Sequence, residues 1–383
     1  MKFIHTSDWH IGRQFHNVSL LEDQRHVLMQ VIEYLKAEKV DALVIAGDIY
    51  DRSVPPATAV ELLDEILNTI CNTLKIPVII ISGNHDSAER LRFASRQLKQ
   101  AGLHIFADIT SIISPVTITG KSGIAVNFYG IPYHDPEQIR HHYNTPIKNH
   151  NEAHSFLINK IIEPCKPSSE AINVLISHCF VDGAEECESE RPLSIGGADR
   201  VSYTPMLNFN YVALGHLHGP QYRGENHIRY SGSILKYSFS EQHQKKGVTL
   251  VEFNLNGSPT ISHLPLKPLR NMRILEGEIT DIVEQGKTDP HADDYLMVRL
   301  TDTHAILNAM GKLREVYPNV LHLEKPGIMA VGEQKAMNRE KLKRSEIDMF
   351  RDFYSQVSSG VLSAEQNNAL EAVINGLHKS EAK

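Results

Sequence analysis

Five short segments carry aspartate, asparagine and histidine side chains, whose oxygen and nitrogen atoms bind divalent metal ions. In chain order they supply Asp8 and His10 in TSDWH, Asp48 in AGD, Asn84, His85 and Asp86 in SGNHD, His178 in LISH, and His216 and His218 in LGHLH. Two divalent ions roughly 3.5–4 Å apart can hold a hydroxide nucleophile and clamp the oxygens of a phosphate. Such a pair needs a bridging carboxylate and neutral imidazoles. We therefore predict an enzyme that hydrolyses phosphate esters with two metal ions.

Each segment also has an ordinary structural explanation. A Gly-Asp pair after a strand is usually a turn or a helix cap, and a single histidine is more often structural than a ligand. The five segments together are a stronger indication, because all supply nitrogen or oxygen ligands and none supplies sulfur. A ligand set without cysteine favours Mn²⁺ or a similar ion over structural zinc.

Every one of these segments follows a predicted strand. Continuous apolar runs predict strands at residues 2–6, 42–46, 77–81, 172–176 and 211–214. Amphipathic stretches at residues 20–38, 57–74 and 89–101 predict helices, so the chain begins as an α/β layer with helices covering a sheet. Sites in such layers form beyond the carboxyl ends of the strands, and the five segments should therefore meet at one place.

The segment PLKP at residues 265–268 marks the predicted end of a first domain, residues 1–268. Residues 269–328 alternate short strands and helices, which predicts a small α+β module. Residues 329–383 start with a run of mixed charge and continue with two helices, of which the second opens on the capping-box pair Ser363 and Gln366. The apolar residues of the first of these helices are Ile347, Phe350, Tyr354 and Val357.

The composition excludes several classes of protein. With 383 residues, 41% hydrophobic and 22% charged, the chain has an ordinary globular balance. It has no apolar run of the roughly 20 residues that a membrane helix needs, and no signal-peptide order at its start. Its four cysteines lack paired spacing, so we expect a cytoplasmic protein. The net charge of -7 lacks the basic excess typical of nucleic-acid binders.

The order of the five segments resembles that of the calcineurin-like metallophosphoesterases. A narrower resemblance is to the bacterial DNA nuclease subunits of that family, which work with a coiled-coil ATPase. It rests on HTSDWHIG, AGDIYDR, ISGNHDS, SERPLSIGG, ALGHLH and YSGSILKYSFSE, which begin at residues 5, 46, 81, 189, 213 and 230. The resemblance implies an α/β sandwich of two sheets flanked by helices. It also implies a small α+β domain that caps the site over DNA, and a C-terminal helical tail that docks on the ATPase.

The resemblance further implies a role for each matched residue. The implied metal ligands are Asp8, His10 and His218 for one ion, Asn84, His178 and His216 for the other, and Asp48 for both, with Mn²⁺ as the expected metal. His85 would be the general acid that protonates the leaving oxygen. Asp51 and Asp86 would orient neighbouring histidines. Other branches of the family carry a histidine in place of Asp51, which argues against a transition-state role at this position.

Two groups of charged residues lie outside this ligand set. The acidic segment DGAEECESER, residues 182–191, favours a solvated loop, and the alternative is an element that gates the cleft. The arginines that could contact DNA phosphates near the cleft are Arg13, Arg90, Arg92 and Arg96, although each is equally consistent with helix-surface charge.

From this resemblance we expect a Mn²⁺-dependent nuclease of DNA repair, recombination and replication. It would act as a double-strand exonuclease and as an endonuclease on single strands and hairpins, and it would form a homodimer within a heterotetramer with the ATPase. One alternative is a phosphodiesterase or phosphatase that acts on a small molecule or a phosphoprotein. A second is a DNA-end-binding subunit without turnover, although a binding site has no need of an acid such as His85.

Overall fold

The computed structural model describes residues 1–163, 171–190, 199–304, 306–325, 351, 354 and 362–381. The chain divides into two compact units, Met1–Asn271 and Met272–Lys383. The predicted linker and most of the predicted helix around residues 347–357 lie outside the described residues. No described helix combines the length and apolar character that crossing a membrane requires.

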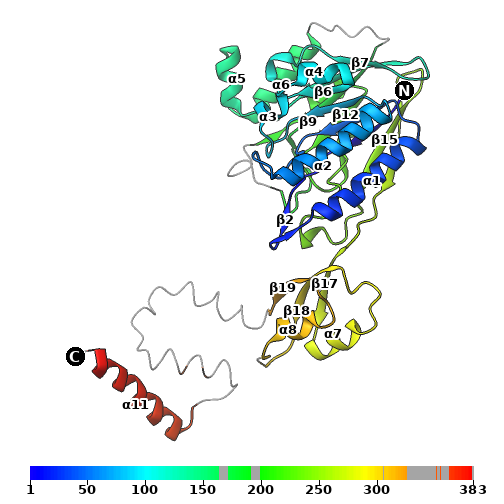
Figure 1. The fold of residues 1–383 in the computed structure, drawn as a ribbon. Coiled ribbons are helices and arrows are strands. Elements are labelled where there is room, and N and C mark those ends of the chain that lie inside the picture. The colour runs from blue at the N-terminus through cyan, green and yellow to red at the C-terminus, as the bar shows by residue number, and fades with distance from the viewer. Residues whose placement is uncertain are drawn as a thin grey trace. The chain divides into compact units, whose positions relative to one another are not determined.

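The first unit contains two six-stranded sheets (Figure 1). The first sheet has the order β16-β15-β1-β4-β5-β6, formed by β1 (Lys2–Thr6), β4 (Ala42–Ala46), β5 (Val78–Ile81), β6 (Leu103–Phe106), β15 (Gly247–Phe253) and β16 (Pro259–Pro265). The second has the order β13-β14-β12-β9-β8-β7, formed by β7 (Val116–Thr119), β8 (Ala125–Ile131), β9 (Ile172–His178), β12 (Tyr211–Gly215), β13 (Gln221–Arg223) and β14 (Glu225–Tyr230). Two small ribbons pair β2 (Gln14–Phe15) with β3 (Val18–Ser19) and β10 (Phe180–Val181) with β11 (Arg200–Val201).

The strands that precede the candidate ligands are parallel within each sheet. In the first sheet β1, β4 and β5 run in the same direction, and in the second sheet β9 and β12 do so. Parallel strands need a covered surface on both faces, which is why β4 reads ALVIA and is buried throughout. The inner faces of the two sheets share one core, in which Phe3 meets Phe128 edge to face at 5.4 Å between ring centroids.

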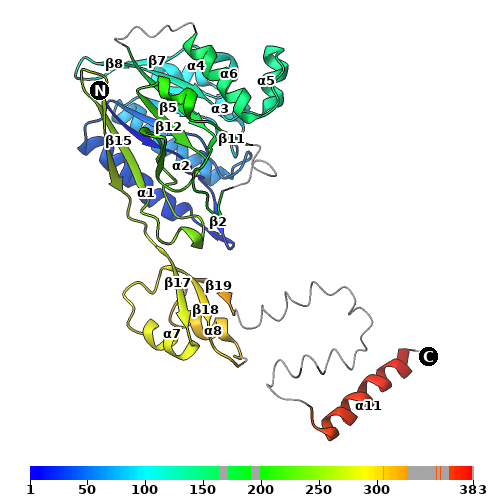
Figure 2. The ribbon, with the colours of Figure 1, turned by 180° about the vertical axis from the view of Figure 1, so that it is seen from behind.

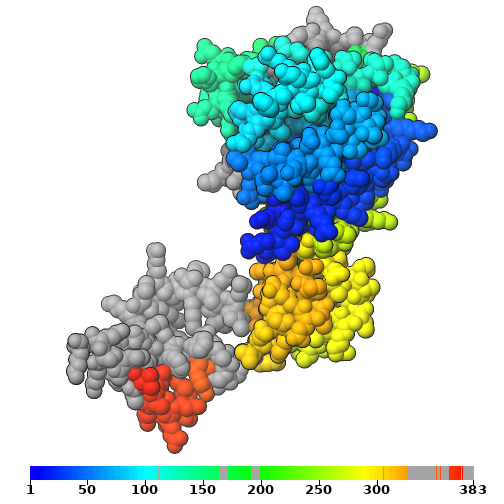
Figure 3. Space-filling view, in the orientation of Figure 1, coloured from blue at the N-terminus to red at the C-terminus, as the bar shows by residue number. Residues whose placement is uncertain are grey.

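Helices cover the outer faces of the two sheets (Figures 1 and 2). Their bounds are α1 (Leu21–Ala37), α2 (Ala57–Asn68) with a π-helical continuation η1 (Thr69–Thr73), α3 (Ala88–Arg92), α4 (Ser95–Leu98), α5 (Pro136–Tyr143) and α6 (His150–Ile162), with short 3-10 turns η2 (Lys99–Ala101), η3 (Ile109–Ser111), η5 (Thr204–Asn208) and η6 (Phe239–Glu241). In the space-filling view, blue and cyan atoms from the first part of the chain form most of the visible surface of the first unit (Figure 3).

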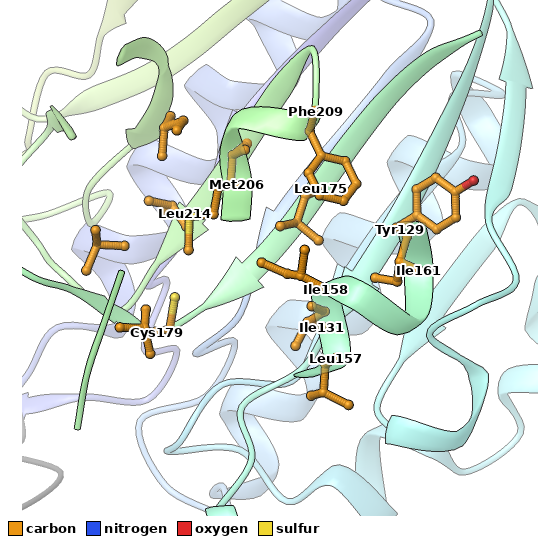
Figure 4. Close-up of a cluster of buried hydrophobic side chains, with 14 of the residues drawn as sticks. Tyr129, Ile131, Leu157, Ile158, Ile161, Leu175, Cys179, Met206, Phe209 and Leu214 are labelled. Atoms are coloured by element: carbon orange, nitrogen blue, oxygen red, sulfur yellow. The ribbon is translucent and has the colours of Figure 1, made fainter. Parts of the chain in front are cut away.

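A second core lies between α6 and the outer face of the second sheet. Tyr129 and Ile131 of β8 and Leu175 of β9 contribute to this core together with Leu157 and Ile158 of α6 (Figure 4). All five are buried, so α6 is held on the sheet by apolar contact rather than by charge. This packing fixes β9, the strand that ends in a candidate ligand.

One predicted helix is broken in the structure. We expected a single helix at residues 89–101, but α3 ends at Arg92, and Ala94 has a φ of 57° before α4 begins. Neither glycine nor proline stands at this point, so the sequence carries no signal for the break. One consequence is that Phe93 is 82% exposed.

The second unit contains a three-stranded parallel sheet. Its order is β17 (Met272–Gly277), β18 (Tyr295–Leu300), β19 (Val320–Glu324), connected by α7 (Ile279–Gly286) and α8 (Ala309–Arg314). Leu296, Val298 and Leu313 belong to its buried core. The alternating strands and helices were expected. In the last helix, α11 (Ala364–Glu381), Ser363 and Gln366 form the predicted capping box, with hydrogen bonds of 2.9 and 3.3 Å.

Candidate metal centre

The structure brings the predicted ligands together at the carboxyl ends of five strands, three in one sheet and two in the other. In chain order Asp8 and His10 follow β1, Asp48 follows β4, Asn84 follows β5, His178 ends β9, and His216 and His218 follow β12. All are buried except Asn84, which is partly exposed. Each sheet therefore contributes part of one cluster, as the strand-end argument predicts.

One group consists of Asp8, His10 and His218. Each offers a ligand atom, and these atoms lie within 4.8 Å of one another. The Nε2 atoms of His10 and His218 are 3.1 Å apart. Two imidazole nitrogens at this separation, both buried, form a suitable pair of ligands for one ion.

A second group is centred on Asn84. Its Oδ1 lies 2.9 Å from Nε2 of His178 and 3.2 Å from Nδ1 of His216. The other ring nitrogen of His178, Nδ1, lies 2.9 Å from the backbone oxygen of Ala46. Since a carbonyl only accepts hydrogen bonds, Nδ1 carries the proton, and the lone pair of Nε2 is left to bind a metal ion together with Oδ1 of Asn84.

The carboxylate of Asp48 lies between the two groups. Its Oδ2 is 3.6 Å from Nε2 of His10 and 3.5 Å from Nε2 of His178. Its Oδ1 accepts a hydrogen bond of 2.9 Å from the backbone N–H of His85. A carboxylate placed evenly between two sets of ligands has the geometry that bridging requires.

The electrostatics of the cluster fit bound cations. Burial lowers the pKa of His10 and His216 well below the usual value, and neighbouring histidines lower it further. Burial is also the main cause of the lowered pKa of His178. The imidazoles are therefore neutral and free to bind a metal. Burial and the charge of Asp48 raise the pKa of Asp8 well above its usual value, a repulsion that a divalent cation would relieve.

Four of the seven candidate ligands have left-handed backbone conformations. The φ angles are 52° at Asp8, 45° at His10, 51° at Asp48 and 103° at His216. Such conformations cost free energy in residues other than glycine and concentrate at functional sites.

Three glycines allow the loops of the cluster to approach closely. A Cβ atom at Gly215 would lie 1.8 Å from the backbone oxygen of Ala46, which would push the two sheets apart. At Gly47 it would lie 2.3 Å from Nδ1 of His178, and at Gly83 it would lie 2.1 Å from Oδ1 of Asp48. The glycines of the AGD, SGN and LGH segments are thus required by the packing around the ligands.

His85 lies at the edge of the cluster and opens into a cavity. Its ring is edge-on to that of His10, with centroids 4.7 Å apart, and its Nδ1 is 2.7 Å from the backbone oxygen of Asp51. The cavity measures about 500 Å³ and is lined by Arg13, Gln14, Asp51, Arg52, Ser53, Asn84, His85 and Ser189. A phosphate ester in this cavity would meet Asn84 and His85 together.

The expected role of Asp86 needs correction, whereas Asp51 does lie beside the histidines it was expected to orient. The side chain of Asp86 does not orient a histidine; it accepts hydrogen bonds from the backbone N–H groups of Ile49, Tyr50 and Gly83. It therefore joins the loop after β4 to the loop after β5. Asp51 holds His85 through its backbone oxygen. Its Oδ1 lies 3.8 Å from Nδ1 of His10 and pairs with Arg13 at 3.3 Å.

The acidic segment at residues 182–191 is not simply a solvated loop, which corrects our expectation. Oε1 of Glu190 accepts a hydrogen bond of 2.6 Å from the backbone N–H of His218, and Oγ of Ser189 lies 2.7 Å from its Nδ1. Burial is the main cause of the rise in the pKa of Glu190 to about 7. The end of this segment is part of the site.

Several supporting residues were missed in the sequence. Gln24 of α1 donates to the backbone oxygens of His10 at 2.7 Å and Trp9 at 3.2 Å, and accepts from Gly12. A fully buried glutamine on the apolar face of an amphipathic helix is a signal that could have revealed it. Glu241 and Lys246, a buried ion pair beside His218, follow no pattern that the sequence displays.

The four arginines considered as phosphate contacts are distributed over three cavities. Arg13 lines the cavity over His85. Arg92 and Arg96 line a different cavity of about 610 Å³, and Arg90 lines a third of about 920 Å³, whose walls are mainly apolar. The structure therefore places only Arg13, of these four, in the cavity beside the candidate metal ligands.

The chain is similar to known protein families and to several solved structures. Residues 268–358 match the family model SbcD_C, described as the type 5 capsule protein repressor C-terminal domain. Similar solved structures include TT1561 of Thermus thermophilus (11% identity, covering 68% of this chain and 98% of that chain, TM-score 0.39) and a dimetal phosphatase from Danio rerio (12%, 70% and 99%, 0.42). Another is Yfce, a phosphoesterase from E. coli (17%, 70% and 100%, 0.27).

Residues 1–220, which hold every candidate ligand, match the model of the calcineurin-like phosphoesterases. With the SbcD_C match, the two models reproduce the domain order of an SbcD-like nuclease subunit. Since the first match spans more than half of the 383 residues, the chain belongs to the calcineurin-like phosphoesterase family.

Proposed function

We propose that this chain is a Mn²⁺-dependent DNA nuclease, the SbcD-like subunit of a DNA repair and recombination complex. The observation that carries the proposal is the position of Asp48, whose Oδ2 is nearly equidistant from His10 and His178. This arrangement suits a pair of divalent ions. When bound, such a pair stabilises negative charge on the phosphate and activates water as the nucleophile.

The chain's own residues would hold the ions and the substrate. We assign Asp8, His10 and His218 to one ion, Asn84, His178 and His216 to the other, and Asp48 to both. These ligands are neutral imidazoles, carboxylates and an amide, a set that suits Mn²⁺. No covalent intermediate with the chain is needed, because water attacks the phosphorus directly.

His85 is the proposed general acid. Its Nδ1 donates to the backbone oxygen of Asp51, which leaves Nε2 to carry the proton that the leaving oxygen of the phosphodiester needs. Its backbone N–H is tied to Asp48, so the acid and the bridging carboxylate keep a fixed relationship. Arg13, at the wall of the same cavity, can contact a phosphate oxygen.

DNA is the proposed substrate because of the parts that follow the catalytic domain. We propose that residues 1–268 form the nuclease domain and that residues 269–328 cap the site over the duplex. Residues 329–383 would contain a linker and helices that dock on an SbcC-like ATPase with a coiled coil. The SbcD_C match over residues 268–358 supports this assignment. We further propose a homodimer within a heterotetramer. The net charge of -7 leads us to expect weak DNA binding by the chain alone.

The test is cleavage of end-labelled linear duplex and hairpin DNA with Mn²⁺, by wild type, Asp48→Ala and His85→Ala. His141→Ala, an exposed histidine of α5, is the matched control. The proposal expects cleavage by wild type and control, and loss in both site variants.

A different substrate would give a different pattern. Intact DNA, even with an added SbcC-like ATPase, together with Mn²⁺-dependent hydrolysis of bis-nitrophenyl phosphate would contradict the DNA assignment and favour a small-molecule or phosphoprotein phosphodiesterase. DNA binding without hydrolysis of either substrate would favour the non-catalytic subunit.

A further inference from the structure

The two ring nitrogens of His218 face different partners. Nε2 lies 3.1 Å from Nε2 of His10, inside the candidate metal centre. Nδ1 lies 2.7 Å from Oγ of Ser189, outside it. Ser189 belongs to the acidic segment between β10 and β11, which supplies no candidate ligand of its own. The hydrogen bond to Ser189 therefore decides which nitrogen of His218 carries the proton, and so whether Nε2 offers a lone pair to the metal centre.

The direction of this hydrogen bond follows from a second hydrogen bond that Ser189 makes. Oγ of Ser189 also donates to Oε1 of Glu241 at 2.5 Å. A serine hydroxyl has one proton, and a carboxylate can only accept. Ser189 must therefore give its proton to Glu241 and accept the proton of His218 Nδ1. The neutral ring then has its proton on Nδ1 and its lone pair on Nε2.

A buried lysine keeps Glu241 ionised and in place. Nζ of Lys246 is 2.5 Å from Oε2 of Glu241, and both side chains are almost fully buried. Nζ also donates to the backbone oxygen of His218 and to Oγ of Ser233, each at 2.8 Å. Lys246 thus fixes the main chain of His218 directly and its ring through Glu241 and Ser189.

The same loop segment is attached to His218 at a second point. Oε1 of Glu190 accepts from the backbone N–H of His218 at 2.6 Å. Nearby, Sγ of Cys187 accepts a hydrogen bond of 2.9 Å from Gln244, which lies two residues before Lys246 in the sequence. Residues 187–190 are therefore joined both to the ligand and to the segment that carries the lysine.

We propose that Ser189, held by Glu241, is a positioning residue that sets the tautomer of His218 and so the affinity of the ion site formed by Asp8, His10 and His218. The inference rests on the proposed function in one respect, that these three residues bind a divalent ion. It predicts that a loop without ligands of its own controls one of the two ion sites and leaves the other unaffected.

The test measures Mn²⁺ binding to the metal-free full-length chain, with free Mn²⁺ followed by its electron paramagnetic resonance signal. Wild type is expected to bind two ions. Ser189→Ala is expected to weaken one ion by about 10–100-fold, the usual cost of removing a partner behind a metal-bound histidine, and to leave the other unchanged. Ser189→Thr keeps the hydroxyl and should restore binding. Ser240→Ala, which removes an exposed hydroxyl next to Glu241 in the sequence, is the matched control.

Other outcomes overturn the proposal in distinguishable ways. Unchanged affinity of both ions in Ser189→Ala refutes the positioning role alone. A loss at both sites, with a lower melting temperature in chelator, shows a structural role instead. Ser189→Cys checks this case, because it keeps the volume with a weaker hydrogen-bonding group: a purely structural role predicts that it binds both ions like wild type. A wild type that binds no Mn²⁺ refutes the metal centre itself. Binding of two ions without DNA cleavage refutes only the DNA substrate.

Discussion

Nδ1 of His85 lies 2.7 Å from the backbone oxygen of Asp51, so the orientation of this histidine depends on main chain rather than on a carboxylate side chain. A carbonyl oxygen accepts only, and Nδ1 is therefore protonated. Nε2 is left as the ring atom that can exchange a proton with substrate.

Replacing His85 tests its role as an acid independently of metal binding. His85→Ala removes the proton donor but no predicted ligand, so the cleavage rate at saturating Mn²⁺ should fall by about 10²–10⁴-fold. Mn²⁺ affinity, measured on the same protein, should stay unchanged. A parallel loss of Mn²⁺ would instead identify His85 as a ligand.

Asp48→Asn should show whether Asp48 contributes to metal binding rather than to the stability of the metal-free fold. Asp48 raises the pKa of Asp8 and contributes to the rise in the pKa of Asp86 to about 7, in both cases after the larger effect of burial, so it destabilises the metal-free chain by repulsion. Asparagine removes this charge. In chelator the variant should melt at the same temperature as wild type or higher. With Mn²⁺ added, only wild type should gain stability, because ligand that binds the native state stabilises it. Calorimetry with and without Mn²⁺ measures both effects, and a variant that still gains fully from Mn²⁺ would contradict a bridging role.

Gly215→Ala should disrupt the contact between the sheets. The new Cβ would lie 1.8 Å from the backbone oxygen of Ala46, and backbone cannot move aside as a flexible side chain can. We expect a loss of about 3 kcal/mol or more in the free energy of unfolding, measured with urea. Gly219→Ala is the matched control, since the nearest atom to its Cβ is a glutamine nitrogen at 3.3 Å. Equal stability of the two variants would show that the sheets can separate without cost.

Acid should destabilise the fold through buried histidines outside the metal centre. Burial is the main cause of the drop in the pKa of His154 to about 3, and its Nε2 is 2.8 Å from Oγ of Ser177. The unfolded chain takes up a proton on this residue below pH of about 6.5, whereas the folded chain does not. Stability therefore falls as pH drops below this value, by up to about 1.4 kcal/mol per pH unit for this group.

The matching variant is His154→Gln, which can keep the contact with Ser177 but does not titrate. It should be less stable than wild type at pH 8, and the difference should shrink as the pH falls toward 5. Urea unfolding of the metal-free proteins at several pH values measures this. A difference that is constant with pH would mean that His154 takes up its proton equally in the folded and the unfolded chain.

The strands of the first unit were predictable because burial on both faces leaves continuous apolar runs. Residues 42–46 and 2–6 were predicted with the bounds that β4 and β1 have. Edge strands such as β16 were missed, since its pattern alternates partly exposed and exposed residues and lacks a buried one. The break at Ala94 was missed for another reason. It depends on the fold around the segment and not on a local proline or glycine.

The candidate ligands were predictable because each stands directly after a buried strand. Most of their supporting residues were not. Lys246, for example, lies 28 residues after His218. Contacts of this kind depend on how loops return to the site, which periodicity does not record. The acidic segment was misjudged because its composition suggested exposure to solvent, whereas Ser189 and Glu190 are partly buried and hydrogen-bonded to His218.

The division of the candidate ligands between two sheets has a consequence for the protein during its synthesis. The first sheet supplies Asp8, His10, Asp48 and Asn84, and the ligands at residues 178, 216 and 218 come from strands made much later. Neither half can form the bridged cluster alone, and the strained loops reach their positions only once the sheets have docked. A nascent or partly unfolded chain would therefore hold no complete centre. Hydrolytic activity would begin only in a chain whose two sheets have docked against each other.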